Sequence, residues 1–291
     1  MKPWLAALML CRNEEWIIGL SLRAALKWCD VAVVLLHSCT DHSQRIVEEI
    51  AAEHPGRVNI LASQSPLWCE MEHRQALLVA ARAVGATHMA IVDADEVLTG
   101  NLLGTVREQI AQLPPGGFLR TRMFCPWRSI HHYRSGQSIW ANRTDFVLAF
   151  ADSAPLCWSA INGYDHHHRQ PINSRCVAQW TSAGGGVMHL QFVQWERLTA
   201  KHALYKMSER VKFPHKPLTQ IDQMYNLALD ESGLLLEPVP VTWWQPYLSF
   251  GHLLDTSNPP WQVAECERLL LEYGPSPFVG LNLFGVVEVK P

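Results

Sequence analysis

Two aspartates one residue apart, Asp93 and Asp95, are the residues of this chain best placed to do chemistry. They follow an apolar run at 88–92 that has the composition of a buried strand, and Glu96 adds a third carboxylate. Carboxylate oxygens are hard ligands that suit Mg²⁺ or Mn²⁺, and such ions are commonly bound together with phosphate oxygens. An aspartate that caps a helix would have the same place in the sequence. The position directly after a buried strand favours a metal site with Asp95 and Asp93 as ligands.

A histidine and a lysine later in the chain extend this prediction. His189 follows three consecutive glycines at 184–186 and ends a short apolar run. A neutral imidazole suits Mn²⁺, although a hydrogen-bonded histidine in a core strand is the alternative interpretation. Lys201 lies one or two turns into the next expected helix, where an ammonium group could meet a diphosphate or simply be solvated. We expect His189 to be a metal ligand and Lys201 to contact phosphate.

The elements that must position these residues alternate between strand and helix over the first hundred residues. We expect strands at 4–11, 31–36, 58–61 and 88–92, with helices at 13–28, 40–53 and 70–84 between them. Uninterrupted apolar strands in such repeats predict parallel βαβ units with helices on both faces of the sheet. Ligands of such sheets bind beyond the carboxyl ends of the strands. This rule brings residues 12–14, 37–41 and 93–96 to one edge.

The rest of the chain is less regular. We expect helices at 102–113, 194–209 and 219–229 and strands at 118–124, 146–150 and 187–190, while the last sixty residues are rich in Pro and Trp. No convincing linker interrupts the chain. We therefore expect a single domain over 1–291, with a nucleotide-binding half at 1–115 and an irregular half at 116–291.

Composition excludes several classes of protein. The formal charge of −3 gives no electrostatic basis for binding nucleic acid or an anionic membrane. The eight cysteines form no C-x-x-C pair and are expected to be buried thiols in a reducing compartment. No apolar stretch reaches the roughly 18–20 residues of a membrane span, and the N-terminal run has no cleavage site. We expect a cytoplasmic protein without a transmembrane segment.

Four segments together resemble the family 2 glycosyltransferases of the GT-A fold: residues 8–15 (LMLCRNEE), 40–43 (TDHS), Arg74 and 91–96 (IVDADE). Their order and spacing match over roughly the first 100 residues. The resemblance implies an α/β, Rossmann-like, mainly parallel central sheet flanked by helices, with an irregular C-terminal part that binds the acceptor. It implies a hexosyl- or pentosyl-transferase that uses a nucleotide-diphosphate sugar and Mn²⁺ or Mg²⁺.

The same resemblance implies roles for individual residues. The donor-binding positions are Arg12, Asn13, Glu14, Asp41, Arg74, Asp93 and Lys201. Asp95 binds the metal with His189, and Asp93 reaches the ribose or the sugar. The family has an aspartate at the end of the second strand to hold the nucleoside, whereas this chain has His37, which leaves the base open.

Transfer to a hydroxyl with inversion requires a carboxylate that removes the acceptor proton. Asp165 is the first candidate for this base and Glu196 the second. The unusual run that follows Asp165 suggests acceptor-binding roles for His166, His168 and Arg169, with Arg169 as a possible phosphate clamp. A solvated polar loop is the alternative.

Two other functions share these features. A nucleotidyltransferase would use a similar sheet and acidic metal site, but it would release pyrophosphate and usually carries a glycine-rich basic loop after the first strand. A non-catalytic module that binds nucleotide sugars or glycans would bind the donor without hydrolysing it. The sequence leaves open the sugar, the acceptor (glycan, lipid, protein or modified nucleic acid), the stereochemical outcome and the oligomeric state.

Overall fold

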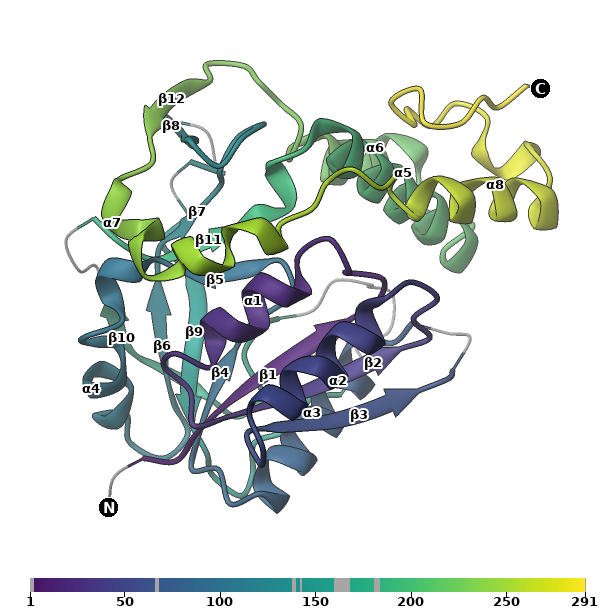
Figure 1. The fold of residues 1–291 in the computed structure, drawn as a ribbon. Helices are drawn as coiled ribbons and strands as arrows, with labels where there is room; N and C mark the ends of the chain where they lie inside the picture. Colours follow the sequence, from purple (N-terminus) through teal and green to yellow (C-terminus); the bar gives the residue numbers. More distant parts are fainter. Residues whose placement is uncertain are drawn as a thin grey trace.

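The computed structural model describes residues 3–65, 68–137, 140–141, 143–159, 168–180 and 184–290 (Figure 1). Its centre is a seven-stranded sheet in the order β10-β6-β9-β4-β1-β2-β3. The strands are β1 (Leu5–Cys11), β2 (Val31–His37), β3 (Val58–Ser63), β4 (His88–Ile91), β6 (Gly117–Thr121), β9 (Phe146–Ala151) and β10 (Arg175–Trp180). β1 to β4 are mutually parallel, β9 runs antiparallel to its neighbours β4 and β6, and β10 is parallel to β6. The predicted α/β class with a mainly parallel central sheet is confirmed.

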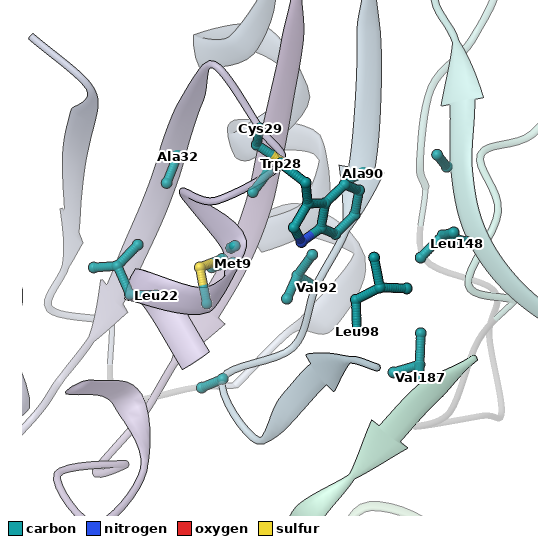
Figure 2. Packing of buried hydrophobic residues seen from close by; sticks show 14 of the residues in the cluster. Met9, Leu22, Trp28, Cys29, Ala32, Ala90, Val92, Leu98, Leu148 and Val187 are labelled. Atoms are coloured by element: carbon teal, nitrogen blue, oxygen red, sulfur yellow. The ribbon is translucent and has the colours of Figure 1, made fainter. Parts of the chain in front are cut away.

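Alternate residues of β1 face opposite layers of helices. Leu5, Ala7 and Met9 belong to a core cluster with residues of α1 (Ile18–Ala25), α2 (Ser43–Glu53) and α4 (Val106–Ala111). Figure 2 shows Met9 and Leu22 of this cluster close to Val92 and Trp28. Ala6, Leu8 and Leu10 pack instead with α3 (Glu70–Ala83). Because both faces are covered, the whole of β1 is buried, which explains its uninterrupted apolar sequence.

A second, three-stranded sheet lies beyond β4, in the order β5-β11-β7. It consists of β5 (Glu96–Leu98), β7 (Met123–Phe124) and β11 (Val187–His189), and β11 pairs antiparallel with β5 so that His189 lies opposite Glu96. A two-stranded sheet joins β8 (His132–Ser135) to β12 (Leu235–Pro238). The β5–β11 pairing carries a residue from late in the chain to the turn that follows β4.

The C-terminal helices form a separate small core. α5 (Trp195–Lys212), α6 (Leu218–Asn226) and α8 (Gln262–Tyr273) pack around residues such as Met207, Ile221 and Cys266. In Figure 1 they lie on the side toward which β1 and β2 point, next to the carboxyl ends of these strands. Short helices complete the chain: η1 (Gly100–Leu102), η2 (Leu190–Phe192), α7 (Val241–Trp244), η3 (Gln245–Leu253) and η4 (Ser276–Phe278). No helix in the described part of the chain has the length and apolar character needed to cross a membrane.

Some predicted boundaries are wrong. The helix expected from residue 13 begins at Ile18, because Asn13 has a left-handed φ of 55° and belongs to a turn. The helix expected at 102–113 is divided between η1 and the shorter α4. No helix was expected near 262–273, where α8 is found.

Candidate active site

Asp95 lies in the turn between β4 and β5 and is 4% exposed. Its Oδ1 lies 3.3 Å from Nε2 of His189, and its Oδ2 accepts a hydrogen bond of 3.0 Å from Nζ of Lys201. Burial alone would raise the pKa of this carboxyl, but Lys201 and His189 hold the pKa well below its usual range. His189 and Lys201, which were each identified separately in the sequence, therefore both contact the ionised carboxylate of Asp95.

The glycine run before His189 serves packing. A Cβ on Gly186 would lie 2.1 Å from the carbonyl oxygen of Arg122, and a Cβ on Gly185 would lie 2.7 Å from the hydroxyl of Thr99. The backbone of Gly186 also exchanges hydrogen bonds with Thr99, through its carbonyl to the amide of Thr99 and through its own amide to the hydroxyl. Only residues without a side chain let β11 approach closely enough to place His189 against Asp95.

Asp93 is held from two sides by arginines. Its Oδ1 accepts a hydrogen bond of 3.2 Å from Nη2 of Arg74, and its Oδ2 accepts one of 2.9 Å from Nη1 of Arg169. Arg74 is itself fixed by a hydrogen bond of 2.7 Å to Glu70. Burial would raise the pKa of Asp93, but the two guanidinium groups lower it overall. The side chain of Asp93 retains 29% exposure, so it is ionised, oriented and accessible.

Glu14 approaches the same centre from the end of β1. Trp16 donates a hydrogen bond of 2.6 Å from Nε1 to its carboxylate. Burial, followed by the charge of Asp95, raises the pKa of Glu14 to about 8, and Lys201 offsets part of this rise. Glu14 therefore belongs to the group around Asp95 and Lys201. This agrees with the prediction that residues 12–14 and 93–96 lie at the same edge of the sheet.

The other predicted donor-binding residues join the loops after β1 and β2. Asn13 accepts a hydrogen bond of 2.7 Å from the amide of Thr40, and Asp41 accepts one of 3.0 Å from the amide of Glu15. Arg12 lies over the ring of Trp261, with 5.0 Å between its guanidinium carbon and the ring centroid. These contacts fix the shape of the carboxyl edge of the sheet. Direct contact of Arg12, Asn13 and Asp41 with a donor stays a prediction.

The structure moves Arg169 away from its predicted role. Its guanidinium points inward, to Asp93, Glu96 and two backbone carbonyls, and not toward a phosphate or an acceptor. Glu196, the second candidate base, is exposed in the first turn of α5, and the His168 side chain is exposed. Asp165 and His166 lie outside the described residues. The base and acceptor assignments, apart from that of Arg169, stay predictions.

Glu96 is the site residue that the sequence analysis undervalued. It is 1% exposed, and its carboxylate accepts hydrogen bonds from Arg169 and, at 2.9 Å, from the amide of Asp93. The sequence signal was present, because a buried strand that ends in three acids within four residues requires a nearby cation. The C-terminal contact of Trp261 with Arg12 had no comparable signal.

The donor atoms at Asp95 and His189 suit a divalent cation. Two ligand atoms bound to Mg²⁺ at 2.0–2.1 Å and at right angles lie about 3 Å apart, close to the 3.3 Å between Oδ1 and Nε2. Within the described ranges, no group of three or more His, Cys, Asp or Glu side chains forms a complete metal cage. A site with two protein ligands fits an ion whose remaining ligands are phosphate oxygens and water.

Comparisons with known proteins add little to this geometry. No protein-family model matches the sequence, and no curated protein matches it. The structure is similar to S. aureus TarS 1-349 in complex with UDP, at 12% identity and a TM-score of 0.45, over 94% of this chain and 82% of that one. It is also similar to the mannosyltransferase PcManGT from Pyrobaculum calidifontis in complex with GDP-Man and Mn²⁺, at 13% identity and a TM-score of 0.41, over 98% and 79% of the two chains. Similarities this weak establish neither a family nor an activity, so the assignment rests on the residues of this chain.

Proposed function

We propose that this chain is a divalent-metal-dependent glycosyltransferase that takes a sugar from a nucleotide-diphosphate sugar. The observation that carries the proposal is the position of Asp95. Its ionised carboxylate contacts both an imidazole and an ammonium group at the carboxyl edge of a parallel sheet, where ligands of such sheets bind. A second carboxylate, Asp93, lies two residues away and is partly exposed. This combination suits a metal–diphosphate group attached to a sugar and a ribose that offer hydroxyls.

Each residue has a specific task in this proposal. Asp95 and His189 hold Mn²⁺ or Mg²⁺, which neutralises the charge that develops on the nucleoside diphosphate as the bond to the sugar breaks. Lys201 remains charged at neutral pH, because Asp95 raises its pKa despite the opposing effect of burial. Its ammonium group supplies a further positive charge for the diphosphate. Asp93, oriented by Arg74, accepts a hydrogen bond from a hydroxyl of the ribose or the sugar.

Product analysis with a panel of nucleotide sugars and Mn²⁺ tests the proposal. A glycosyltransferase releases a nucleoside diphosphate, slowly to water and faster when an acceptor is present. Release of a sugar 1-phosphate from the nucleotide sugar, or of pyrophosphate when a nucleoside triphosphate and a sugar 1-phosphate are supplied instead, would indicate a nucleotidyltransferase. Metal-dependent binding of a nucleotide sugar without any turnover would indicate a binding module.

The matched variants are Asp95→Asn and Asp145→Asn. Asp145 is an exposed aspartate that pairs only loosely with Arg143, at 3.5 Å, so its substitution is expected to leave turnover unchanged. Asp95→Asn is expected to lower turnover by about 10³-fold or more, because it removes the charge that holds the metal. Turnover by Asp95→Asn at the wild-type rate would refute the proposed site.

A further inference from the structure

Arg169 lies just before β10 and reaches back to the turn after β4. Its side chain is 14% exposed, and the plane of its guanidinium packs on Phe146, with 4.1 Å between the guanidinium carbon and the ring centroid. No helix or strand contains Arg169, so its own contacts must hold it in place. These contacts join the second half of the chain to the Asp93–Glu96 turn.

All the hydrogen-bonding capacity of the Arg169 guanidinium is used inside the protein. Nε donates to the carbonyl of Val147 at 2.9 Å, and Nη2 donates to the carbonyl of Ile91 at 2.6 Å. Nη1 donates to Asp93 Oδ2 at 2.9 Å and to Glu96 Oε1 at 2.8 Å, and Nη2 also donates to Glu96 Oε2. A guanidinium has five N–H groups, and these five bonds account for all of them. Arg169 therefore acts through protein groups and has no N–H left for a phosphate.

The bonds of Arg169 fix the orientation of Asp93. Glu96, which Arg169 grips with both of its terminal nitrogens, accepts the amide of Asp93 at 2.9 Å. Asp93 is thus held through its backbone by Glu96 and through its Oδ2 by Arg169, while Arg74 holds Oδ1. A lysine has three donors on a flexible chain and cannot reproduce this planar set of bonds.

We propose that Arg169 is a positioning residue, which acts through Asp93 and Glu96 to aim the Asp93 carboxylate at the hydroxyls of the donor. This inference rests on the proposed function, because it assumes that Asp93 binds the donor. Misplacement of a binding group by about 1 Å can cost on the order of 10²-fold in rate, so loss of this attachment is expected to be visible in kinetics.

A double-mutant cycle between Arg169→Lys and Asp93→Asn tests the proposal. The kcat/KM for donor turnover is measured at a temperature well below the melting temperature of each variant. Arg169→Lys is expected to lower kcat/KM by about tenfold or more. If Arg169 acts through Asp93, the double variant should lose no more than Asp93→Asn alone. Arg175→Lys is the matched control, because Arg175 is an exposed arginine at the start of β10.

The positioning role would be overturned if the losses in kcat/KM of the two single variants multiplied in the double variant, or if Arg169→Lys had wild-type kinetics. Either result would leave the proposed function intact. If Arg169→Lys does not fold, Glu96→Gln replaces it in the cycle, since it removes the charge that Arg169 grips. If the wild type turns over no nucleotide sugar, the proposed function fails. The positioning role is then tested by measuring the melting temperatures of the same two single variants and the double variant. Shifts in melting temperature that are not additive support the positioning role, and additive shifts overturn it.

Discussion

Replacing Lys201 with methionine separates the roles of the lysine and the metal at Asp95. Nζ of Lys201 lies 3.0 Å from Oδ2 of Asp95, and the side chains of Lys201 and Asp95 are 19% and 6% exposed. Removal of one partner from a buried ion pair costs about 3–5 kcal/mol, because the other charge stays buried without compensation. Methionine keeps the helix propensity and much of the length of lysine, so α5 should be preserved. For a chain of this size, we expect the metal-free variant to melt about 5–10 °C below the wild type.

Mn²⁺ should restore part of this loss. In the wild type, the metal and Lys201 share the charge of Asp95, whereas in Lys201→Met only the metal can take the place of the ammonium group beside Asp95 and His189. We expect the variant to bind Mn²⁺ about tenfold more tightly, which corresponds to about 1.4 kcal/mol of additional stabilisation. Thermal unfolding of both proteins with and without Mn²⁺ measures this difference. Donor turnover should nevertheless fall, because the ammonium group proposed to meet the diphosphate is missing.

The matched control is Lys206→Met on the same helix. Lys206 is fully buried and pairs with Asp222 at 2.8 Å, and it donates to Asn226 and to the carbonyl of Asn282. Its removal should also destabilise the protein, but Mn²⁺ should not restore the loss, since these partners belong to the C-terminal core. Equal stabilisation of the wild type and Lys201→Met by Mn²⁺ would show that Lys201 and the metal do not share Asp95.

Three further substitutions test other parts of the account. Burial lowers the pKa of His73 to about 4, below its value near 6.5 in the unfolded chain. The free energy of unfolding that His73 contributes above pH 6.5 is therefore lost as the pH falls toward 4. His73→Phe should reduce the fall in the free energy of unfolding between pH 7 and pH 5 by about 2 kcal/mol, measured by denaturant unfolding. Gly186→Ala should destabilise the protein by about 2 kcal/mol or more, seen as a lower melting temperature, because its Cβ would lie 2.1 Å from the carbonyl of Arg122. Arg74→Lys should lower kcat/KM for the donor by about tenfold, since lysine cannot bind Glu70 and Asp93 together as Arg74 does.

Each of these three expectations would be contradicted by a specific result. Parallel pH profiles of His73→Phe and the wild type would show that His73 titrates normally. An unchanged melting temperature of Gly186→Ala would mean that β11 does not require a glycine there. Unchanged donor kinetics of Arg74→Lys would remove Arg74 from the donor site.

The fold of the first hundred residues could be predicted from the sequence because it depends on patterns within short stretches of the chain. Continuous apolar strands and helical spacing predicted the parallel strands β1 to β4, and the rule for ligand sites brought Glu14 and Asp95 together. The meeting of His189 and Lys201 at Asp95 agrees with roles that were assigned separately to each residue. The start at residue 13 that was expected for the first helix was wrong, since the side chain of Asn13 bonds to Thr40 across two loops and the helix begins at Ile18.

The remainder depends on contacts between distant segments that no local pattern encodes. The inward direction of Arg169 follows from Val147, Ile91 and the buried Glu96, which lie between 22 and 78 residues away. α8 has a buried face only because α5 and α6 supply the other side of the core. β5 was not expected, because this three-residue strand depends on its pairing with β11 and not on a periodicity of its own.

The central claim is that Asp95 and His189 hold a metal together with a nucleoside diphosphate. The most direct test measures thermal unfolding with a panel of nucleoside diphosphates, with and without Mn²⁺, for the wild type and for His189→Ala. A ligand at 100 times its Kd stabilises the native state by about 2.7 kcal/mol, a shift of several degrees. We predict such a shift for one base only, only with Mn²⁺, and much reduced in His189→Ala. The absence of any metal-dependent shift in the wild type, or an equal shift in His189→Ala, would contradict the account.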